Sequence, residues 1–515
     1  MALPELIEIV PLDKPVRAEI TVPGSKSITN RALILAALAD GPVTLKGALW
    51  SEDTQIMVAC LKELGFVVHV SPDPEEPCNR TLLVVGQGGI VPAGGTEAEP
   101  VELFVGNAGT AARFLAPFLC LGGGVYRLHG VPRMHERPQA ALFQALRELG
   151  CRVESENEND KLPVRIFAGE AGRPPESMTE FTQRKQASTG PKKCRVSITE
   201  SSQFASALLL SSKAGRWEVE IEGENAEESP YVAMTSKLME VFPTKGGTFQ
   251  IEPDASSGSY FLAAGTSEPI GTLETKREGN PDGGFTITSF AKYKLSATVR
   301  GWRSHSGWQV DAKFPEYFLV ATPIDFSTPE EMAALENKAF ELWGPNWRQK
   351  TWDQYSKRQG GQVMKVSRQT DLGDSIMTLI TVAPLSGQKI VFTDLGRLRV
   401  QECERVVALR TELTKCGAKV IEEGDTLTVY PAKPGELHGA EIETYNDHRM
   451  AMCFAILGLK IRGICIKNPA CVKKTFPNFF QKLADAPPHG LGAEIWEVKN
   501  GRRTRRLTGA DLFAD

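Results

Sequence analysis

The stretch "VPGSKSITNRALILAALADG", residues 22–41, places small and cationic residues directly in front of an almost wholly apolar run. Pro23 and Gly24 favour a turn, and the run after Arg31 has no consistent polar face. A helix that is apolar on nearly every side is buried. Its polar first turn leaves free N–H groups and a partial positive charge, so the stretch predicts a helix head that attracts anions.

Five further stretches have the same form, a small or polar head followed by an apolar run rich in small residues. In each, Ser, Thr, Asn or Asp stands where a helix N-cap belongs. They are GNAGTAARFLAPFL from Gly106, ESSQFASALLLSS from Glu200, PDASSGSYFLAAG from Pro253, TDLGDSIMTLITVAP from Thr370 and YNDHRMAMCFAILGL from Tyr445.

Most heads are followed by an amphipathic helix, such as SEDTQIMVACLKELGF at 51–66 or QECERVVALRTELTKCG at 401–417. Alternating β-branched stretches such as TLLVVG and DTLTVYP predict strands between them. Each unit is therefore a buried helix, an amphipathic helix and several strands. Six such units cannot each form a core, so we expect them to share cores, three per domain.

Length and charge restrict the class of protein. The 515 residues exceed the roughly 250–300 residues at which one core stops growing. A net charge of −4 disfavours binding to nucleic acid or to a membrane surface, which needs a basic excess. An anionic ligand must therefore meet cations concentrated at the helix heads, and the candidates are Lys26, Arg31, Arg113 and Arg449.

Metal and targeting signals are weak. The ten cysteines form no CxxC motif and the seven histidines show no ligand spacing, so neither a metal site nor a disulfide framework is expected. The first residues carry Glu5 and Glu8 in place of a cationic signal-peptide start. No apolar run reaches the ~18 residues of a membrane span. A cytoplasmic location is expected.

The heads and the segments between them carry specific motifs in a fixed order, from about residue 8 to about residue 486. They are PGSKSITNRAL, GNAGTAARF, RMHERP, SSQF, DASSGSYF, TDLGDSIMT, YNDHRMAM and KKTFPNF. This ordered set resembles the 5-enolpyruvylshikimate-3-phosphate (EPSP) synthase family, enolpyruvyl transferases of the shikimate pathway of aromatic amino-acid biosynthesis.

The resemblance implies an α/β (α+β) fold, a two-domain inside-out α/β barrel in which three repeated helix-and-strand units surround buried parallel helices in each domain. Residues 1–24 and 253–515 would form domain I and residues 25–252 domain II, with the active site in the cleft between them. Two insertions relative to the family, near 268–292 and 325–362, lengthen domain I.

The implied reaction transfers the carboxyvinyl group of phosphoenolpyruvate to the 5-hydroxyl of shikimate 3-phosphate and releases phosphate. It passes through a tetrahedral intermediate and needs no metal or organic cofactor. Many members are targets of the herbicide glyphosate, which occupies the phosphoenolpyruvate pocket. The expected partners are these two small anions, without nucleic acid or membrane, and the expected state is a monomer.

Site residues follow from the resemblance, motif by motif. Asp374 would take the hydroxyl proton and Glu402 would serve the methylene carbon, with Lys26 as acid or charge stabiliser. Phosphoenolpyruvate would contact Lys26, Gly109, Arg137, Gln203, Arg405, Arg449 and Lys474. Shikimate 3-phosphate would contact Ser27, Arg31, Ser201, Ser202, Gln203, Tyr231, Asp374, Arg397 and Gln401. Asn107, at the second head, would contact the ligands.

Taken one at a time, these residues also have structural interpretations. Asp374 is suited to an N-cap, Glu402 to a solvated helix face and Lys474 to a surface ion pair. His448 is expected to be a structural hydrogen-bonding residue. The ordered motif set favours the functional interpretation of the first three.

The chain departs from the family pattern in several places. "RLRVQECER" has Arg397 where Asn is usual and Gln401 where Lys is usual, and Glu228 stands where a phosphate-contacting Ser is common. The 325–362 insertion concentrates tryptophans, which we interpret as a surface subdomain or, alternatively, an oligomer contact; these are Trp343, Trp347 and Trp352. The basic tail from Asn500 is expected to be an exposed extension.

Two other functions compete. One is the transfer of enolpyruvate to UDP-N-acetylglucosamine, whose enzymes typically carry Lys-Asn in the first motif and a catalytic Cys on a loop. This chain has Lys26-Ser27 there, and Arg137-Pro138 on the loop. The other is a non-catalytic anion-binding relative, for which the carboxylates Asp374 and Glu402 would have no use.

Overall fold

A computed structural model describes most of the chain: residues 3–13, 16–169, 191–223, 230–265, 274–279, 285–290, 295–300, 307–321 and 363–514. The chain divides into two compact units, unit 1 (Met1–Val22 and Pro253–Asp515) and unit 2 (Pro23–Glu252). Pro23 and Gly24, expected to end the first domain, thus begin unit 2. The predicted 325–362 insertion and Glu228 lie outside the described residues.

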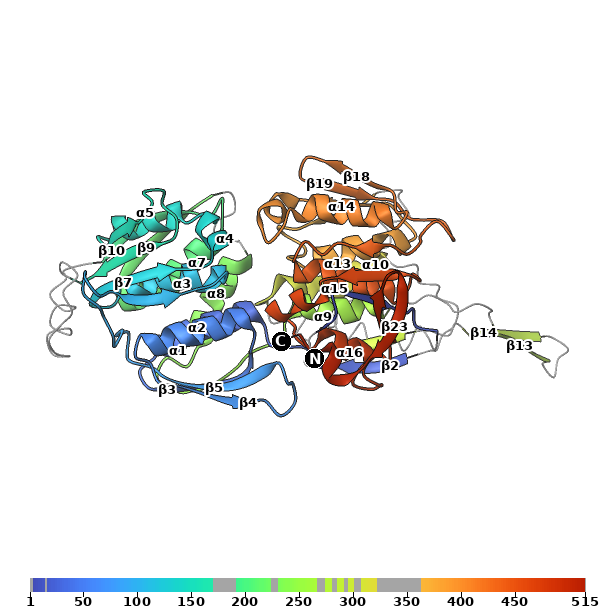
Figure 1. Cartoon of the computed structure of the whole chain (residues 1–515), viewed down its shortest axis with the longest axis horizontal. Helices are drawn as coiled ribbons and strands as arrows, with labels where there is room; N and C mark the ends of the chain where they lie inside the picture. Colours follow the sequence, from blue (N-terminus) through green and yellow to red (C-terminus); the bar gives the residue numbers. More distant parts are fainter. Residues whose placement is uncertain are drawn as a thin grey trace. The chain divides into compact units, whose positions relative to one another are not determined.

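Unit 2, coloured blue to green in Figure 1, is built around three central helices that pack against one another. They are α1 (Lys26–Leu38), α3 (Gly109–Leu119) and α7 (Ser202–Gly215). All 11 residues of α3 are buried, as its uniformly apolar sequence predicts. The outer helices are α2 (Glu52–Glu63), α4 (Pro132–Glu136), α5 (Ala140–Glu148) and α8 (Pro230–Val241).

The sheets of unit 2 repeat one pairing scheme. In the orders β12-β3-β5-β4 and β6-β7-β9-β8, the first pair is parallel and the other two are antiparallel. β10 and β11 form a separate parallel pair. The strands are β3 (Pro42–Leu49), β4 (Val68–Pro72), β5 (Asn79–Val85), β6 (Val101–Phe104), β7 (Gly124–His129), β8 (Arg152–Ser155), β9 (Val164–Ala168), β10 (Lys192–Ser197), β11 (Trp217–Glu222) and β12 (Gly247–Gln250).

Unit 1 has its own three central helices, α9 (Ala255–Ala264), α13 (Ile376–Val382) and α15 (His448–Gly458), which also pack against one another. A buried polar chain joins them, because Ser259 Oγ lies 2.9 Å from Thr378 Oγ1, which lies 3.8 Å from Cys453 Sγ. Around them lie α10 (Phe314–Ala321), α14 (Arg405–Lys415), α16 (Phe479–Ala484) and the 3-10 helices η2 (Val310–Lys313), η3 (Ala383–Leu385), η4 (Leu395–Val400), η5 (Pro469–Lys474) and η6 (Gly509–Leu512).

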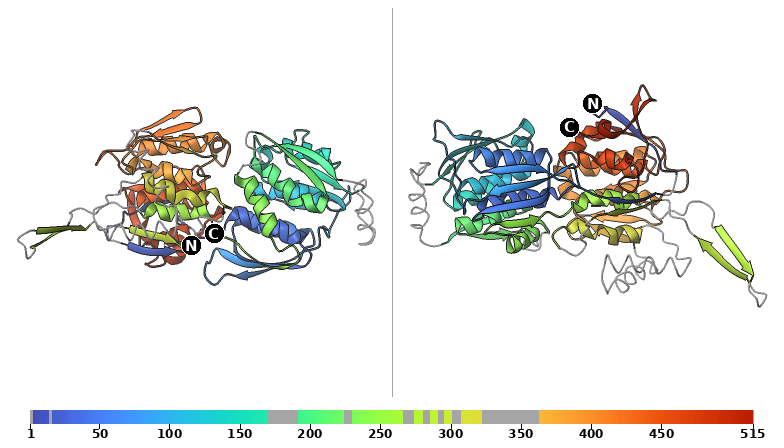
Figure 2. Two further views of the ribbon diagram at one scale, coloured as in Figure 1. Left: turned by 180° about the vertical axis from the view of Figure 1, so that it is seen from behind. Right: turned by 90° about the horizontal axis from the view of Figure 1, so that it is seen from below.

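One sheet of unit 1, in the order β16-β17-β19-β18, repeats the scheme of unit 2, one parallel and two antiparallel pairs. A five-stranded sheet has the order β20-β21-β1-β22-β23, and β15 pairs in parallel with β2, so the two chain segments of unit 1 share sheets (Figure 2). The strands are β1 (Leu6–Ile9), β2 (Val16–Ile20), β15 (Leu295–Val299), β16 (Met364–Ser367), β17 (Ile390–Thr393), β18 (Val420–Glu423), β19 (Thr426–Val429), β20 (Glu441–Ile442), β21 (Ile464–Lys467), β22 (Ile495–Lys499) and β23 (Arg502–Leu507).

The predicted fold class, with three helix-and-strand repeats per unit, is confirmed, and several local predictions were wrong. Helix α3 begins after Ala108 instead of after a polar cap. Part of the region 268–292, expected to be loop-rich, forms the antiparallel pair of β13 (Glu274–Gly279) and β14 (Phe285–Phe290). The basic tail is the edge strand β23, and one of its arginines, Arg503, donates two 2.7 Å bonds to Glu8.

The segment KKTFPNFFQKLADA, which begins with the last quoted motif, does not form one continuous helix. η5 ends at Lys474 and α16 begins at Phe479, because Pro477 between them cannot continue a helical hydrogen-bond ladder. This break leaves Lys474 at the end of a short 3-10 turn. None of the described helices combines 18 residues with the apolar character needed to cross a membrane.

Candidate active site

In unit 1, the Asp374 carboxylate lies between two guanidiniums. Arg368 Nη2 donates to its Oδ1 at 2.8 Å, and Arg449 Nη2 lies 3.0 Å from its Oδ2. Burial raises the pKa of Asp374, but the charges of Arg449, Arg368 and Arg405 outweigh burial and hold that pKa far below its usual range. Asp374 is therefore ionised, and it becomes a better proton acceptor when a competing anion draws these cations away.

The turn that presents Asp374 is fixed from a second direction. Ser375, and not Asp374, is the N-cap residue of α13, and its N–H and hydroxyl donate to Asp311 Oδ1 at 2.9 and 2.5 Å. A Cβ at Gly373 would come within 2.8 Å of Asp311 Oδ2, so the close packing requires glycine. The structural interpretation of Asp374 as the N-cap of this helix is thus wrong.

Glu402 lies in the bend between η4 and α14 and contacts three cationic or imidazole groups. Lys474 Nζ lies 2.9 Å from Oε1, His448 Nδ1 lies 2.8 Å from Oε2, and Arg405 Nη2 lies 3.7 Å from Oε2. Burial raises the pKa of Glu402, but His448, Lys474 and Arg405 outweigh burial and lower it. The alternatives of a solvated helix residue for Glu402 and a surface pair for Lys474 were wrong.

Arg405 joins this group to the head of α15. Its Nε and Nη2 donate to Asp447 Oδ2 and Oδ1 at 2.7 and 3.2 Å, and its Nη1 donates to Gln401 Oε1. Asp447 also caps α15 by accepting from Arg449 N at 2.9 Å. Burial lowers the pKa of Arg405, but Asp447, Glu402 and Asp374 outweigh burial and raise it. The guanidinium stays charged.

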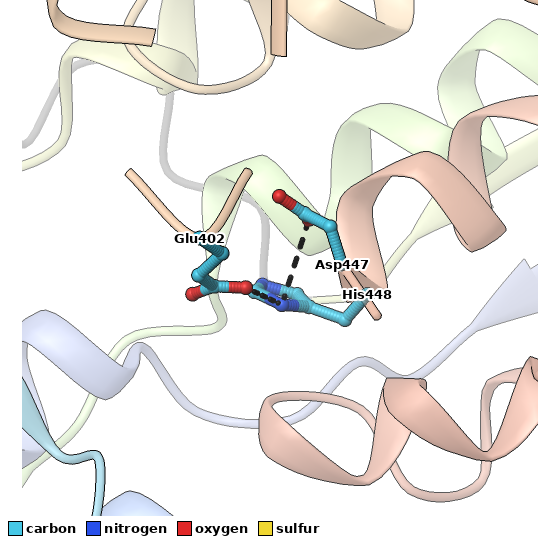
Figure 3. A group of neighbouring side chains, drawn as sticks. All are labelled: Glu402, Asp447 and His448. Carbon is cyan, nitrogen blue, oxygen red and sulfur yellow. Dashed lines mark ion pairs between the residues drawn. The ribbon is translucent and has the colours of Figure 1, made fainter. Parts of the chain in front are cut away.

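Figure 3 shows Glu402 on a loop close to Asp447 and His448 at a helix head. One oxygen or nitrogen atom of each side chain lies within 4.8 Å of those of the other two. Burial lowers the pKa of His448, although Glu402 and Asp447 oppose this shift. Lys474 and Arg405 already neutralise the two carboxylates at 2.9 and 2.7 Å. A metal cation would have to compete with both, so the group is better described as an ion-pair network than as a metal centre.

In unit 2, the heads of the central helices carry the predicted cations and small residues. Lys26 is the first residue of α1, and its Nζ lies 3.1 Å from Oδ2 of the buried Asp53. A Cβ at Gly109 would lie 2.5 Å from the Arg137 guanidinium, which donates to the Asn107 carbonyl at 3.2 Å. These contacts place Arg137 over the head of α3.

Gln203 joins the head of α7 to the head of α3. Its Nε2 donates to Thr110 Oγ1 at 3.2 Å, and its Oε1 accepts from Arg113 Nη1 at 2.7 Å. Ser201 caps α7 by accepting from Gln203 N at 3.3 Å. Two helix N-termini and two guanidiniums thus occur together, an arrangement suited to a phosphate group.

Arg31 differs from the other predicted ligand residues. Its side chain is only 1% exposed, and it donates to Thr235 Oγ1 at 2.7 Å and Ser206 Oγ at 3.1 Å. Its guanidinium also lies 5.1 Å from the Phe114 ring centre. Burial lowers its pKa to about 10. This guanidinium ties α1 to α3, α7 and α8.

The structure brings most predicted residues into two groups, one per unit. In unit 1 a network runs from Asp374 through Arg449 and Asp447 to Arg405. Arg405 contacts both Gln401 and Glu402, and Glu402 contacts Lys474. Unit 2 holds the contacts of Lys26, Asn107, Gly109, Arg137, Ser201 and Gln203 described above. Ser27 and Ser202 lie in the first turns of α1 and α7, Tyr231 in the first turn of α8, and Arg397 in η4.

Sequence reasoning missed the partners Arg368, Asp447, Asp53 and Asp311. Asp447 was recognisable as the cap in "YNDHRM", but nothing local links it to Arg405, 42 residues away. Arg368 follows β16 without any periodic signal. Only packing identifies these residues.

The family model described as EPSP synthase (3-phosphoshikimate 1-carboxyvinyltransferase) matches residues 11–246 and 333–483. The chain belongs to the EPSP synthase family. A 3-phosphoshikimate 1-carboxyvinyltransferase of Opitutus terrae is 36% identical over 493 residues, covering 94% of this chain and 98% of the relative. The chloroplastic enzyme of that name from Solanum lycopersicum is 34% identical, covering 94% and 85%.

Solved structures support the fold. An EPSP synthase from Acinetobacter baumannii matches with a TM-score of 0.59 at 20% identity, covering 96% of this chain and 100% of that one. The enolpyruvyl transferase NikO from Streptomyces tendae matches with a TM-score of 0.56 at 13% identity, covering 99% and 100%. At these identities the likeness concerns the fold alone.

Proposed function

We propose that this member of the EPSP synthase family transfers the carboxyvinyl group of phosphoenolpyruvate to the 5-hydroxyl of shikimate 3-phosphate and releases phosphate, as a step of aromatic amino-acid biosynthesis. Curated relatives at 36% and 34% identity carry the name of this activity. The observation that carries the mechanism is the pair of ionised carboxylates, Asp374 and Glu402, each held by cations that an anionic substrate can engage.

Residues of both units contact the same two substrates in this proposal. In unit 2, Lys26, Arg137, Gln203 and the backbone of Gly109 bind the phosphate of phosphoenolpyruvate, together with Lys474 of unit 1. Its carboxylate is taken by Arg405 and Arg449, whose planar guanidiniums match a carboxylate in bidentate geometry. Contacts to shikimate 3-phosphate come from Ser27, Ser201, Ser202, Tyr231, Asn107, Arg397 and Gln401.

Arg31 supports the shikimate 3-phosphate site through α1 and α7 in this account. Its contacts with Ser206 and Thr235 fix the helices whose first turns carry Ser27, Ser201 and Ser202. Gln401 uses its amide oxygen on Arg405, so it helps to orient that guanidinium and adds no charge.

Asp374 acts on the acceptor. As the 5-hydroxyl oxygen attacks C2 of phosphoenolpyruvate, its proton passes to the Asp374 carboxylate. Arg449 Nη2 lies 3.0 Å from Asp374 Oδ2. When the substrate carboxylate shares Arg449, the pKa of Asp374 rises toward the range useful for a general base.

Glu402 acts on the carbon. Phosphoenolpyruvate engages Lys474 and Arg405, two of the groups that keep the pKa of Glu402 low. That pKa then rises, Glu402 takes up a proton from solvent, and it gives this proton to the methylene carbon to form the tetrahedral intermediate. Loss of phosphate with return of a methyl proton to Glu402 restores the double bond. Lys26 stabilises the phosphate charge.

The atoms balance without an external reagent. One C–O bond forms between the 5-oxygen and C2, and the C2–O bond to phosphate breaks. Asp374 accepts the hydroxyl proton and then transfers it to the released phosphate or to solvent. We further propose that the enzyme acts in the cytoplasm as a monomer, consistent with its net charge of −4; sedimentation velocity tests the monomeric state.

The test is phosphate release by purified protein supplied with phosphoenolpyruvate and one acceptor at a time. We expect release with shikimate 3-phosphate and none with UDP-N-acetylglucosamine or phosphoenolpyruvate alone. Release with the nucleotide sugar would favour the sister activity. Binding of phosphoenolpyruvate with no release under any condition would favour a non-catalytic relative.

A further inference from the structure

Glu412, in the middle of α14, is a buried carboxylate that the mechanism above does not use. Its side chain is 0% exposed. Oε1 accepts from Tyr445 Oη at 2.8 Å, and Oε2 accepts from Glu443 N at 3.2 Å. Lys415 Nζ lies 2.8 and 2.9 Å from the two oxygens and neutralises the charge. Glu412 therefore binds the loop in front of α15 at two points.

That loop has an unusual backbone. Tyr445 and Asn446 both have φ of 54°, so two consecutive residues with side chains adopt the left-handed conformation. Such residues persist only where surrounding contacts hold them. Asp447 N donates to Thr444 O at 2.8 Å and closes the turn. Glu412 contacts Glu443 and Tyr445, the residues on either side of Thr444.

The same turn delivers residues of the catalytic network. Asp447 and His448 follow Asn446 directly, and they contact Arg405 at 2.7 Å and Glu402 at 2.8 Å. Arg405 begins α14, and Glu412 lies seven residues further along it, about 10 Å away along the axis. One helix thus contacts the turn through Glu412 and the residue that follows it, Asp447, through Arg405.

We infer that Glu412 is a positioning residue for enolpyruvyl transfer: it holds the strained turn 443–446 so that Asp447 and His448 keep Arg405 and Glu402 in their working orientation. This inference rests on the proposed function. Glu412 touches no substrate in the account above, so its effect passes through the turn. Loss of Glu412 should therefore change the KM for phosphoenolpyruvate, which Arg405 binds, more than the KM for shikimate 3-phosphate.

The experiment compares three variants with the wild type. Glu412→Ala removes both acceptors, and the KM for phosphoenolpyruvate should rise about tenfold or more, equivalent to about 1.4 kcal/mol per tenfold change. The KM for shikimate 3-phosphate should stay within about twofold. Tyr445→Phe removes one hydroxyl on a side chain that is 38% exposed, so it should fold normally and show a smaller change in the same direction.

Glu8→Gln is the matched control. Glu8 is also an ion-paired carboxylate of unit 1, 13% exposed and bonded twice by Arg503, but it lies in β1 outside the network. Its loss should lower the thermal midpoint without changing either KM. Equal rises of both KM values in Glu412→Ala and Tyr445→Phe would show a general structural role and overturn the inference.

Hydrogen exchange provides a readout that does not depend on activity. In Glu412→Ala, the amides of Asp447 to Ala451 should exchange faster, while those of β1 and β21 keep their wild-type rates. Unchanged exchange at Asp447 to Ala451 in Glu412→Ala would overturn the positioning role. Unchanged KM values in this variant would overturn it too, provided that the wild type is active. An inactive wild type would refute the proposed function, and the exchange comparison would still test the role of Glu412.

Discussion

Two buried arginines, one in each unit, have the same side chain and nearly the same burial but opposite electrostatics. Arg31 is 1% exposed and Arg405 is 2% exposed. Arg31 donates to the neutral hydroxyls of Thr235 and Ser206, and burial lowers its pKa to about 10. Arg405 donates to the Asp447 carboxylate, and its pKa is raised despite burial.

The charge of the partner, more than burial, decides whether the pKa of a buried arginine falls or rises. In unit 2 the guanidinium serves as a packing element that ties helices together. In unit 1 cations and carboxylates are interleaved, and under the proposed function a bound anion redistributes the pairs and changes the pKa of Asp374 and Glu402. We place the proton transfers in unit 1 for this reason.

The largest expected effect concerns Asp374. Asp374→Asn keeps the shape but cannot take a proton, so kcat should fall roughly 10²–10⁴-fold, the usual range for a general base. Binding of phosphoenolpyruvate, measured by calorimetry, should change little. Turnover at the wild-type rate would show that the ionised carboxylates of unit 1 are structural.

The next effect compares the two arginines directly in urea unfolding. Arg405→Met leaves Asp447, which is fully buried, without its ion-pair partner and should cost about 3–5 kcal/mol. Arg31→Met deprives only neutral hydroxyl and carbonyl oxygens of their donor and should cost about 1–3 kcal/mol. A larger loss of unfolding free energy in Arg31→Met than in Arg405→Met would contradict this difference between the two arginines.

A smaller effect is expected at the head of α3. Gly109→Ala would put a Cβ 2.5 Å from the Arg137 guanidinium, whose flexible end must move away. The KM for phosphoenolpyruvate should rise about tenfold, or about 1.4 kcal/mol, while the thermal midpoint changes little because alanine favours helices. Ala111→Gly in the same helix is the control; it should lower the midpoint and leave this KM unchanged.

The smallest effect is the pH dependence of stability. The pKa of Asp374 is lower in the folded chain than its unfolded value of about 3.9, so the folded state binds fewer protons in this range. Its contribution is present above the unfolded pKa and is lost as the pH falls through the folded pKa. Unfolding followed from about pH 5 to pH 2 should therefore show a shallower loss in Asp374→Asn. Identical acid slopes would contradict the lowered pKa.

Much of the fold could be predicted from the sequence because its repeat is local. Each head and its apolar run predict a buried helix. The six runs correspond to α1, α3, α7, α9, α13 and α15. Ser201, Asp254 and Asp447 cap their helices with side-chain oxygens as predicted. The Ala108 start of α3 could not be predicted, because no polar cap marks it.

The partners in the site could not be predicted, because they are set by distant pairings without periodicity. Arg31 and Thr235 are 204 residues apart, and Arg405 and Asp447 are 42 apart. The sequence therefore indicated which residues carry charge, and the packing decides which partners they meet. Arg31 meets neutral oxygens, and Glu402 meets Lys474 and Arg405.

The most direct test is a single turnover in D₂O with enzyme, phosphoenolpyruvate and shikimate 3-phosphate at comparable concentrations, followed by NMR of the quenched mixture. The account predicts that phosphate is released and that the methylene group of the carboxyvinyl product contains deuterium. In Glu402→Gln, both phosphate release and deuterium incorporation should be strongly slowed. Phosphate release with a methylene group free of deuterium would contradict proton transfer to carbon and, with it, the role assigned to the unit 1 network.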